Sequence, residues 1–268
     1  MRRAVVPGTA IAIVLPTILL FSLTGCGHPK QARTNVPPPP SATPESSSNE
    51  APGTSHPEGA AKNDRLSGPE ASNADLAEPT IPANATPVST ETGKASWYGP
   101  PYHNRRGSNG EFYNMHAMTA AHRTLPLGSI VRVTNLKTGH AALVRITDRG
   151  PFIPGRVLDL SLAAARKIDV YQPGVAEVRV EVMQTPVPLD TGGKWAVQIG
   201  GFPGGNEATK VADHLKRRYQ TARVKCFSSP AGDWWVRVRV LDDDRERAQK
   251  LAAETETKEG AVFLVRLD

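Results

Sequence analysis

Cysteine is nearly absent from this chain, and aromatic residues are few. The 268 residues include two cysteines, and Phe, Trp and Tyr together make up 6%. A framework of disulfide bonds is therefore excluded as the basis of the fold. The histidines also lack the paired spacing of metal ligands, so we expect neither a metal site nor a cofactor.

Between Gly27 and Thr92 aromatic residues are missing altogether. This stretch holds twelve of the 24 prolines, including the run from Pro37 to Pro40, and it is rich in Ser, Glu and Asn. A segment without large apolar side chains cannot bury a core. Residues 26–92 are therefore predicted to form a disordered linker, with a root-mean-square reach of about 40–50 Å.

The uninterrupted run of about 20 apolar residues that a membrane-spanning helix needs is also missing. The apolar stretch at residues 4–23 is broken by Pro7 and Pro16, follows two arginines and precedes small residues. This layout is typical of a secretory signal peptide, which we place at residues 1–25. A retained transmembrane anchor is the weaker alternative.

The signal ends in Leu23-Thr24-Gly25-Cys26, which resembles a bacterial lipobox. The resemblance implies that Cys26 becomes the lipid-modified first residue of the mature protein. Gly27 follows it, in place of the aspartate that retains such lipoproteins at the inner membrane. The implied location is the outer membrane, facing the periplasm. Cys226 is then left alone and is expected to be a small buried side chain on a strand.

Positive charge is concentrated in one part of the chain. Residues 93–189 carry twelve Lys and Arg against six Asp and Glu, a net of +6, whereas residues 190–268 carry fourteen against twelve. The excess favours a polyanionic partner. A secreted lipoprotein seldom meets nucleic acid, so the carboxylate-rich bacterial cell wall is the expected partner.

Alternating apolar and polar residues predict short strands in the domain at residues 93–183. The pattern appears at 130–134, 143–147 and 178–182, and the first two segments are joined by a turn, as in a β-hairpin. Only 162–168 looks helical, with Ser161 placed to cap it. Short strands, one small helix and many turns indicate a compact β-barrel.

Three carboxylates lie on predicted loops of this barrel. Asp148 follows a strand, Asp159 ends a stiff excursion rich in Gly and Pro, and Glu111 lies in a turn. Cleavage of a glycosidic bond needs a proton donor and a negative charge near the transition state, roles that two carboxylates can divide. Alternatively, such residues form turns, pair with arginines or are simply solvated. His122 has a structural alternative of the same kind.

Five segments in order closely resemble the rare lipoprotein A family, whose members include septal lytic transglycosylases: Lys94–Gly99, Asn109–Glu111, Thr119–Gly128, Val131–Asn135 and Asp148–Phe152. The resemblance covers residues 93–183 and implies a six-stranded double-psi β-barrel. It also implies functional roles for Glu111, His122 and Asp148. More distantly, the stretch from Asp148 to Asp159 resembles the wall-loosening expansins, in which an aspartate matching Asp159 matters although no bond is cut.

A second unit is predicted at residues 192–268, after a short linker at 184–191. Strand patterns at 195–200, 222–227, 234–240 and 261–267 alternate with helical patterns at 206–219, capped by Asn206, and at 245–255. The order βαββαβ predicts a ferredoxin-like sheet of four strands with two helices on one face and the other face open.

This second unit resembles the SPOR domain, a module that binds peptidoglycan glycan stripped of its stem peptides. The resemblance lies in Trp195–Phe202 and Trp235–Val240. Peptide removal frees a lactyl carboxylate on each muramic acid, and arginine binds carboxylates bidentately. We expect four side chains to face the glycan: Gln198, Trp235, Arg237 and Arg239. Members of the family often continue into Gly-Pro-Phe, whereas Leu241-Asp242-Asp243 follows here.

The expected activity is lytic cleavage of the β-1,4 bond between N-acetylmuramic acid and N-acetylglucosamine, giving 1,6-anhydro ends. Asp148 is the expected acid and base, Glu111 its partner, His122 an orienting residue and Asp159 a further candidate; the roles of Asp148 and Glu111 are interchangeable at this point. The expected setting is septal wall processing beside division proteins. Two alternatives are an expansin-like wall binder that does not cut and a structural division lipoprotein.

Overall fold

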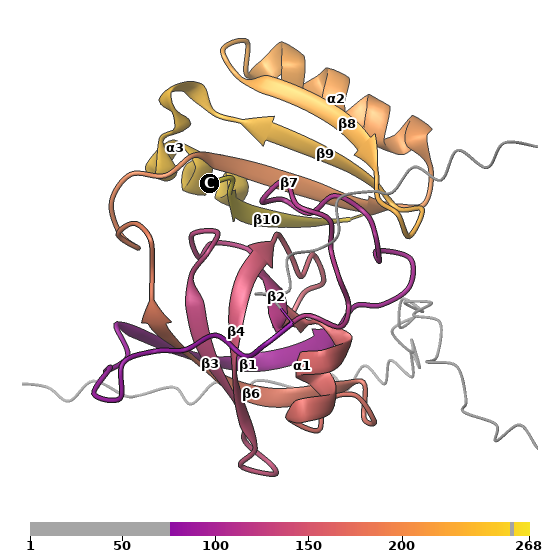
Figure 1. The fold of residues 1–268 in the computed structure, drawn as a ribbon. Helices are drawn as coiled ribbons and strands as arrows, with labels where there is room; N and C mark the ends of the chain where they lie inside the picture. Colours follow the sequence, from indigo (N-terminus) through magenta and orange to yellow (C-terminus); the bar gives the residue numbers. More distant parts are fainter. Residues whose placement is uncertain (1–75, 258–259) are drawn as a thin grey trace, which may run out of the picture. The chain divides into compact units, whose positions relative to one another are not determined.

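The computed structural model describes residues 76–257 and 260–268 of the chain (Figure 1). The predicted signal peptide, Cys26 and most of the predicted linker lie outside these residues. No helix within the described ranges is long and apolar enough to cross a membrane. The described residues all belong to one compact unit, which ends at Asp268.

The first folded part is a closed barrel of six strands, which confirms the predicted fold. The strands are β1 (Ser89–Trp97), β2 (Thr119–His122), β3 (Ile130–Asn135), β4 (Ala141–Asp148), β5 (Arg156–Leu160) and β6 (Val175–Gln184). Around the barrel they follow the order β1-β5-β2-β4-β3-β6. The pairs β1–β5 and β2–β4 are parallel, and the other neighbours are antiparallel. Parallel pairing brings the ends of β2 and β4 to the same side of the barrel.

Alternation of side chains builds the barrel core, as the sequence predicted. On β3 and β4, Val131, Val133, Val144 and Ile146 are fully buried, while polar residues between them stay partly exposed. The two strands form the expected antiparallel hairpin. Gly139 lies in its turn with φ +76°, a conformation that glycine adopts without strain.

The barrel begins earlier than the sequence predicted. We placed residues up to 92 in the disordered linker, but β1 starts at Ser89, because residues 89–92 pair with β6. Further upstream, Glu78 accepts a 2.6 Å hydrogen bond from the Leu143 backbone N–H and pairs with Lys167. The part of the predicted linker from Glu78 onward therefore contacts the barrel.

The predicted helix of the barrel is confirmed. α1 spans Leu162–Lys167, and the Ser161 hydroxyl accepts a hydrogen bond from the Ala164 N–H at 3.1 Å. The same hydroxyl donates to the Ala117 carbonyl, so the cap also joins the helix to the loop before β2. This ties the end of β5 to the neighbouring strand.

The second folded part has the predicted βαββαβ order. Its elements are β7 (Trp195–Phe202), α2 (Gly205–Arg218), β8 (Arg223–Ser228), β9 (Trp234–Arg239), a 3₁₀ turn η2 (Leu241–Asp243), α3 (Arg245–Glu254) and β10 (Ala261–Arg266). The strand order is β10-β7-β9-β8, with every pair antiparallel. The central strand β7 is buried along almost its whole length.

Both helices pack on one face of this sheet (Figure 1). Their buried residues are Ala208, Ala212 and Leu215 on α2 and Ala248 and Leu251 on α3. The predicted helix cap at Asn206 is wrong: α2 begins one residue earlier, and its cap position is Gly204, which lacks a side chain to bond. Cys226 was expected to be buried but is exposed; it lies on β8, an edge strand on which every residue is exposed or only partly buried.

The opposite face of the sheet was predicted to be open and is instead covered. Trp235, Phe263 and Val265 form a separate apolar cluster there, and the barrel residue Phe152 packs on it. The Phe152 ring lies 5.3 Å from that of Trp235 and 5.7 Å from that of Phe263, centre to centre. Large apolar side chains on an uncovered face would be costly in water, which explains why the aromatic pair acquires a partner.

Candidate active site

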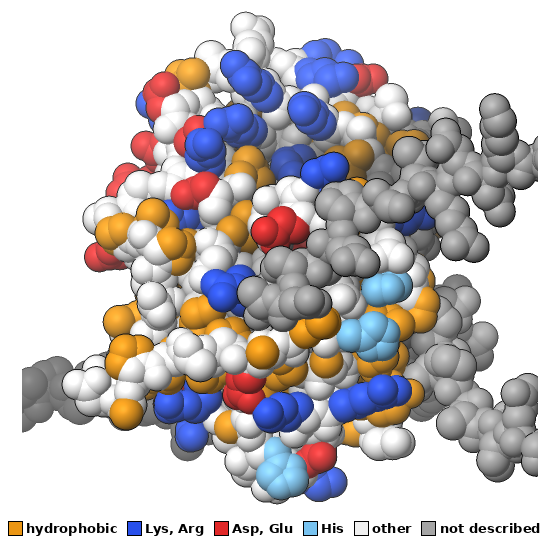
Figure 2. Space-filling model, in the orientation of Figure 1, with side chains coloured by type: hydrophobic (Ala, Val, Ile, Leu, Met, Phe, Trp, Pro, Cys, Tyr) orange, Lys and Arg blue, Asp and Glu red, His pale blue; other side chains and the backbone are white. Residues whose placement is uncertain are grey.

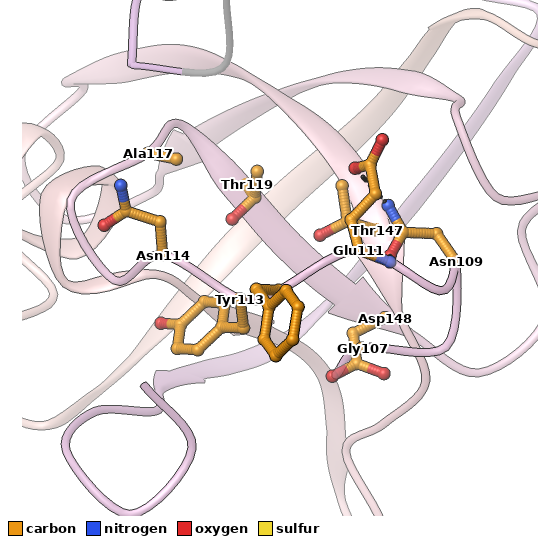
Figure 3. Close-up of a pocket in the computed structure, with 10 residues that line it drawn as sticks. Gly107, Asn109, Glu111, Tyr113, Asn114, Ala117, Thr119, Thr147 and Asp148 are labelled. Atoms are coloured by element: carbon orange, nitrogen blue, oxygen red, sulfur yellow. Dashed lines mark hydrogen bonds between the residues drawn. The ribbon is translucent and has the colours of Figure 1, made fainter. Parts of the chain in front are cut away.

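A groove opens beside the end of β4 and the loop that precedes β2 (Figure 3). It is shallow, with about 350 Å³ of space when the part open to solvent is counted, and it is lined by Gly107, Asn109, Glu111, Phe112, Tyr113, Asn114, Ala117, Thr119, Thr147 and Asp148. The structure therefore brings Glu111 and Asp148, which are far apart in the sequence, into one groove. Loops presented by a rigid barrel are a common place for such sites.

Asp148 is the last residue of β4 and is held by three donors. Its Oδ1 atom accepts hydrogen bonds from the Ser108 N–H at 2.9 Å, the Ser108 hydroxyl at 2.6 Å and the Arg149 N–H at 2.7 Å. All three donors meet one oxygen, and no residue within 76–257 or 260–268 donates a hydrogen bond to Oδ2. The carboxylate orientation is thereby fixed before any substrate arrives.

Glu111 lies on the loop between β1 and β2 and has its own donor. The Asn109 amide donates a 2.6 Å hydrogen bond to Oε2 of Glu111, and the Glu111 N–H returns a 3.1 Å bond to Asn109 Oδ1. Glu111 is exposed to solvent, whereas Asp148 is partly buried. In Figure 3 the two carboxylates extend in different directions from the turn between them. They occupy unlike environments, as a division of acid and charge roles requires.

The turn that holds both carboxylates is built from backbone bonds. The Gly107 N–H donates to the Glu111 carbonyl at 2.7 Å, and the Asn109 N–H donates to the Thr147 carbonyl at 3.2 Å. Gly110, with φ +89°, supplies the left-handed residue that closes the turn. Because Asn109 is bonded to Thr147, the turn is attached directly to the residue before Asp148.

Asp159 lies on β5, across β2 from Asp148. Ala121 on β2 pairs with both, in parallel with Asp148 and antiparallel with Asp159. Asp159 accepts from the Ser96 hydroxyl at 2.6 Å and from Arg156 at 3.2 Å. Burial raises the pKa of Asp159, and the opposing effects of Arg156 and Ser96 leave it above its ordinary value. Asp159 thus lies near the site and keeps its proton to a higher pH than an ordinary aspartate. It does not line the groove itself.

His122, at the end of β2, is buried and its ring contacts neither Asp148 nor Glu111. Nδ1 accepts hydrogen bonds from the Thr124 and Leu125 N–H groups at 3.1 and 2.9 Å. The proton is therefore on Nε2, which lies 2.6 Å from Oε1 of Glu91. Burial raises the pKa of Glu91, but the hydrogen bond from His122 and the nearby charge of Arg123 outweigh it, so the net pKa is lowered. His122 does orient a carboxylate, but that carboxylate is Glu91.

Arg149 anchors the chain after Asp148. Its side chain is buried and donates to the His122 carbonyl at 3.1 Å, the Leu125 carbonyl at 2.6 Å and the Asp268 backbone carbonyl. Burial lowers the pKa of Arg149 to about 10. These bonds couple Asp148 to the end of β2, so His122 affects the site through its backbone as well.

Two tyrosines beside the groove were not predicted from the sequence. The rings of Tyr98 and Tyr113 stack 4.2 Å apart, and the Tyr113 hydroxyl donates to the Tyr98 carbonyl at 2.8 Å. Burial and the charge of Asp148 raise the pKa of both hydroxyls. The Trp97-Tyr98-Gly99 motif is part of the family resemblance. Alternation along a strand, however, does not predict which of its aromatic rings lies beside the site.

The four residues predicted to face glycan lie together on β7 and β9. Gln198 Oε1 accepts from Nε and Nη2 of Arg237 at 3.1 and 2.7 Å, and the Arg237 guanidinium lies 5.1 Å from the Phe227 ring centre. Gln198 is 1% exposed and Trp235 is 7% exposed. Arg239 is more accessible, but its Nε and Nη2 atoms each donate a hydrogen bond to Asp243 of η2. Lys and Arg side chains gather over the region of β8 and β9, as Figure 2 shows.

Family comparisons match both folded parts. Residues 90–180 match the family described as Lytic transglycolase, and residues 191–265 match the SPOR domain. The matches and the six-stranded barrel define a lytic-transglycolase barrel followed by a SPOR domain. In this combination and order of domains, the chain is similar to the rare lipoprotein A (RlpA) family.

Several curated relatives are named "Endolytic peptidoglycan transglycosylase RlpA". The chain is 57% identical to that of Vibrio cholerae over 99 residues, which are 37% of this chain and 38% of the relative. It is 38% identical to that of Helicobacter pylori J99 over 161 residues, 50% of this chain and 51% of the relative. The chain thus spans about half or less of the length of these relatives.

Two solved structures are similar at low scores. Streptomyces papain inhibitor has a TM-score of 0.30 and 20% identity, over 38% of this chain and 100% of that chain. The apo expansin of Clavibacter michiganensis has a TM-score of 0.29 and 16% identity, over 57% of this chain and 81% of that one.

Proposed function

We propose that the barrel is a peptidoglycan lytic transglycosylase. Its substrate is the β-1,4 bond between N-acetylmuramic acid and N-acetylglucosamine, and its product is a 1,6-anhydro end. The observation that carries this proposal is the placement of Glu111 and Asp148 in one groove, each held by its own hydrogen-bond donor. The curated names of the relatives support the same reaction.

The reaction needs one proton to leave a carboxyl group and one to return. The 6-hydroxyl oxygen of muramic acid bonds to C1 of the same sugar while the bond from C1 to the leaving oxygen breaks. A carboxyl group gives its proton to the leaving oxygen, and the resulting carboxylate takes the proton of the 6-hydroxyl. Because the nucleophile belongs to the substrate, proximity supplies much of the acceleration and water need not be positioned.

Asp148 suits the acid and base role, and Glu111 suits stabilisation of positive charge at C1. Asp148 is partly buried and is held through Oδ1, whereas Glu111 is exposed to solvent and is oriented by Asn109. Asp159 adds a buried carboxyl behind Ala121, which positions the loop after Asp148 rather than touching the sugar. His122 positions the end of β2 through Glu91 and Arg149.

The remaining parts of the proposal concern where the enzyme acts. A lipid on Cys26 would hold the protein at the outer membrane, and the linker would let it reach the wall. The SPOR domain would concentrate it on peptide-free glycan at the septum, through Arg237 and Arg239 and the lactyl carboxylates. In this structure Phe152 covers Trp235, so glycan contact with that ring requires Phe152 to move away.

Mass spectrometry of digested sacculi tests the proposal. Sacculi are first stripped of stem peptides with an amidase and then incubated with the purified protein. Soluble fragments with 1,6-anhydro ends are expected from the wild type and not from Asp148→Asn or Glu111→Gln. Reducing ends would indicate hydrolysis instead. Binding without released sugar would overturn the enzyme assignment in favour of wall binding.

A further inference from the structure

Two buried hydroxyl groups lie beside the groove without a regular hydrogen bond. Within the described part of the chain, neither Thr119 Oγ1 nor the Tyr98 hydroxyl has a partner of normal geometry. Thr119 is 4% exposed, so solvent does not replace the missing partner. Removing a hydroxyl from water without a compensating hydrogen bond is unfavourable. The unsatisfied hydroxyl of Thr119, at the start of β2, therefore lowers the stability of the barrel.

The two hydroxyls are neighbours, but they cannot satisfy each other. Burial and the charge of Asp148 raise the pKa of Tyr98 well above its ordinary value, and the nearby Thr119 hydroxyl offsets this only in part. Tyr98 therefore stays protonated and is a donor. Each hydroxyl has one donor hydrogen and acceptor lone pairs. If one donates to the other, one O–H still remains, and it needs an acceptor from outside the protein.

Thr119 is placed where a substrate can supply that acceptor. Its side chain lines the same groove as Glu111 and Asp148, and Figure 3 shows it in the middle of the lining residues. Ala121, two residues along β2, pairs with Asp148. Thr119 and the acid site thus lie on adjacent strands.

We propose that Thr119, supported by Tyr98, is a positioning residue that donates a hydrogen bond to a hydroxyl oxygen of the sugar being cleaved. The inference rests on the proposed function, and the hydroxyl it fits is the 6-hydroxyl of muramic acid. A donor to that oxygen occupies a lone pair and leaves the hydroxyl's own hydrogen free to point at the carboxylate. The exocyclic group otherwise rotates among three staggered positions. Fixing one of them favours attack on C1.

The test replaces the hydroxyl while keeping the shape. Thr119→Val is expected to lower the maximal rate of anhydro-sugar release about tenfold to a hundredfold. The concentration of sacculi that gives the half-maximal rate should change much less. Its thermal unfolding midpoint is expected to be unchanged or higher, because a buried unsatisfied hydroxyl is removed. Thr119→Ser, which keeps the hydroxyl, should recover most of the rate. Tyr98→Phe should fall between the two.

Thr134→Val is the matched control, since Thr134 is a strand threonine on β3 outside the groove. Its rate should equal that of the wild type. A wild-type rate in Thr119→Val would overturn the inference, and so would an equal loss of rate in the valine and serine variants, which would indicate packing alone. Wild-type protein that releases no anhydro ends would instead overturn the proposed function, and this inference with it.

Discussion

The Ser108 hydroxyl donates a 2.6 Å hydrogen bond to Oδ1 of Asp148, across forty residues of sequence. The next residue, Asn109, donates to Glu111 at 2.6 Å. Two adjacent residues in one turn thus orient the two candidate catalytic carboxylates separately. Changing either donor leaves both carboxylates in place, so the contribution of each carboxylate's orientation can be measured on its own.

Ser108→Ala should slow anhydro-sugar release about tenfold. The variant loses a hydrogen bond to a charged group, which contributes about 1.5–3 kcal/mol, although the Ser108 N–H still holds Asp148. Asn109→Ala should have a comparable effect if the orientation of Glu111 matters equally. Initial rates on amidase-treated sacculi measure both, with unfolding midpoints as the control for folding. Wild-type rates in both variants would show that neither bond prepares the site.

The architecture was predictable from sequence because its causes are local. Alternation at 130–134 and 143–147 gave the β3–β4 hairpin, and Ser161 marked the start of α1. Within the site, the family motifs indicated that Glu111 and Asp148 act together. The roles of Ser108 and Asn109 as hydrogen-bond donors to these carboxylates could not be predicted. The hydrogen-bond partners of a turn depend on which strand end lies beside it in the fold.

Three further features differ from the sequence-based predictions, and each depends on contacts between residues far apart in the chain. Glu91 was placed in the linker because its neighbours lack aromatic residues, so its bond to His122 could not be foreseen. Cys226 lies on an apolar-looking segment, but its exposure depends on whether a further strand pairs with β8. The cover over Trp235 depends on Phe152, which is some eighty positions earlier in the chain.

The pH dependence of unfolding should reveal the raised pKa of Asp159. This carboxyl binds its proton more tightly in the folded protein than in the unfolded chain, where the pKa is near 3.8. The stability it contributes is complete below 3.8 and is lost as the pH rises through the folded pKa. Denaturant unfolding of wild type and Asp159→Asn from pH 3 upward measures this. The wild type should lose stability relative to the variant across that window.

Other carboxyls titrate in the same range with the opposite sign, but they are present in both proteins and cancel in the difference. A difference that stays constant with pH would show that Asp159 titrates normally. A difference that grows in favour of the wild type as the pH rises would show that Arg156 and Ser96 outweigh burial and hold the carboxylate ionised.

Removing His122 should destabilise the barrel. The change His122→Ala leaves the partly buried Thr124 N–H and the buried Leu125 N–H without their acceptor, which should lower the free energy of unfolding by about 2–4 kcal/mol. Glu91→Gln should cost about 1 kcal/mol or less at neutral pH, because that carboxyl is 41% exposed. Its lowered pKa means that this contribution is present above 4.5 and is lost as the pH falls through the folded value.

His140→Ala is the matched control, because His140 is also paired with a carboxylate, Asp169, but is 65% exposed. Its free energy of unfolding should change by less than about 0.5 kcal/mol. If His122→Ala were as stable as His140→Ala, the structural role of His122 would be refuted.

Asp243 occupies donors of Arg239 that we expect glycan to use. The aspartate belongs to Leu241-Asp242-Asp243, where related domains often have Gly-Pro-Phe, and it bonds to Nε and Nη2 of Arg239. A lactyl carboxylate must displace it to use the same donors. Such a surface ion pair is weak, so Asp243→Asn should strengthen binding to amidase-treated sacculi by up to about fivefold. Asp242→Asn is the control, since Asp242 is 72% exposed and lies near Arg247 instead.

Co-sedimentation at low and high salt measures the effect, which should shrink as salt screens the exposed charges. Equal binding by wild type, Asp243→Asn and Arg239→Ala would exclude Arg239 from the glycan face and leave Arg237 as its carboxylate-binding group.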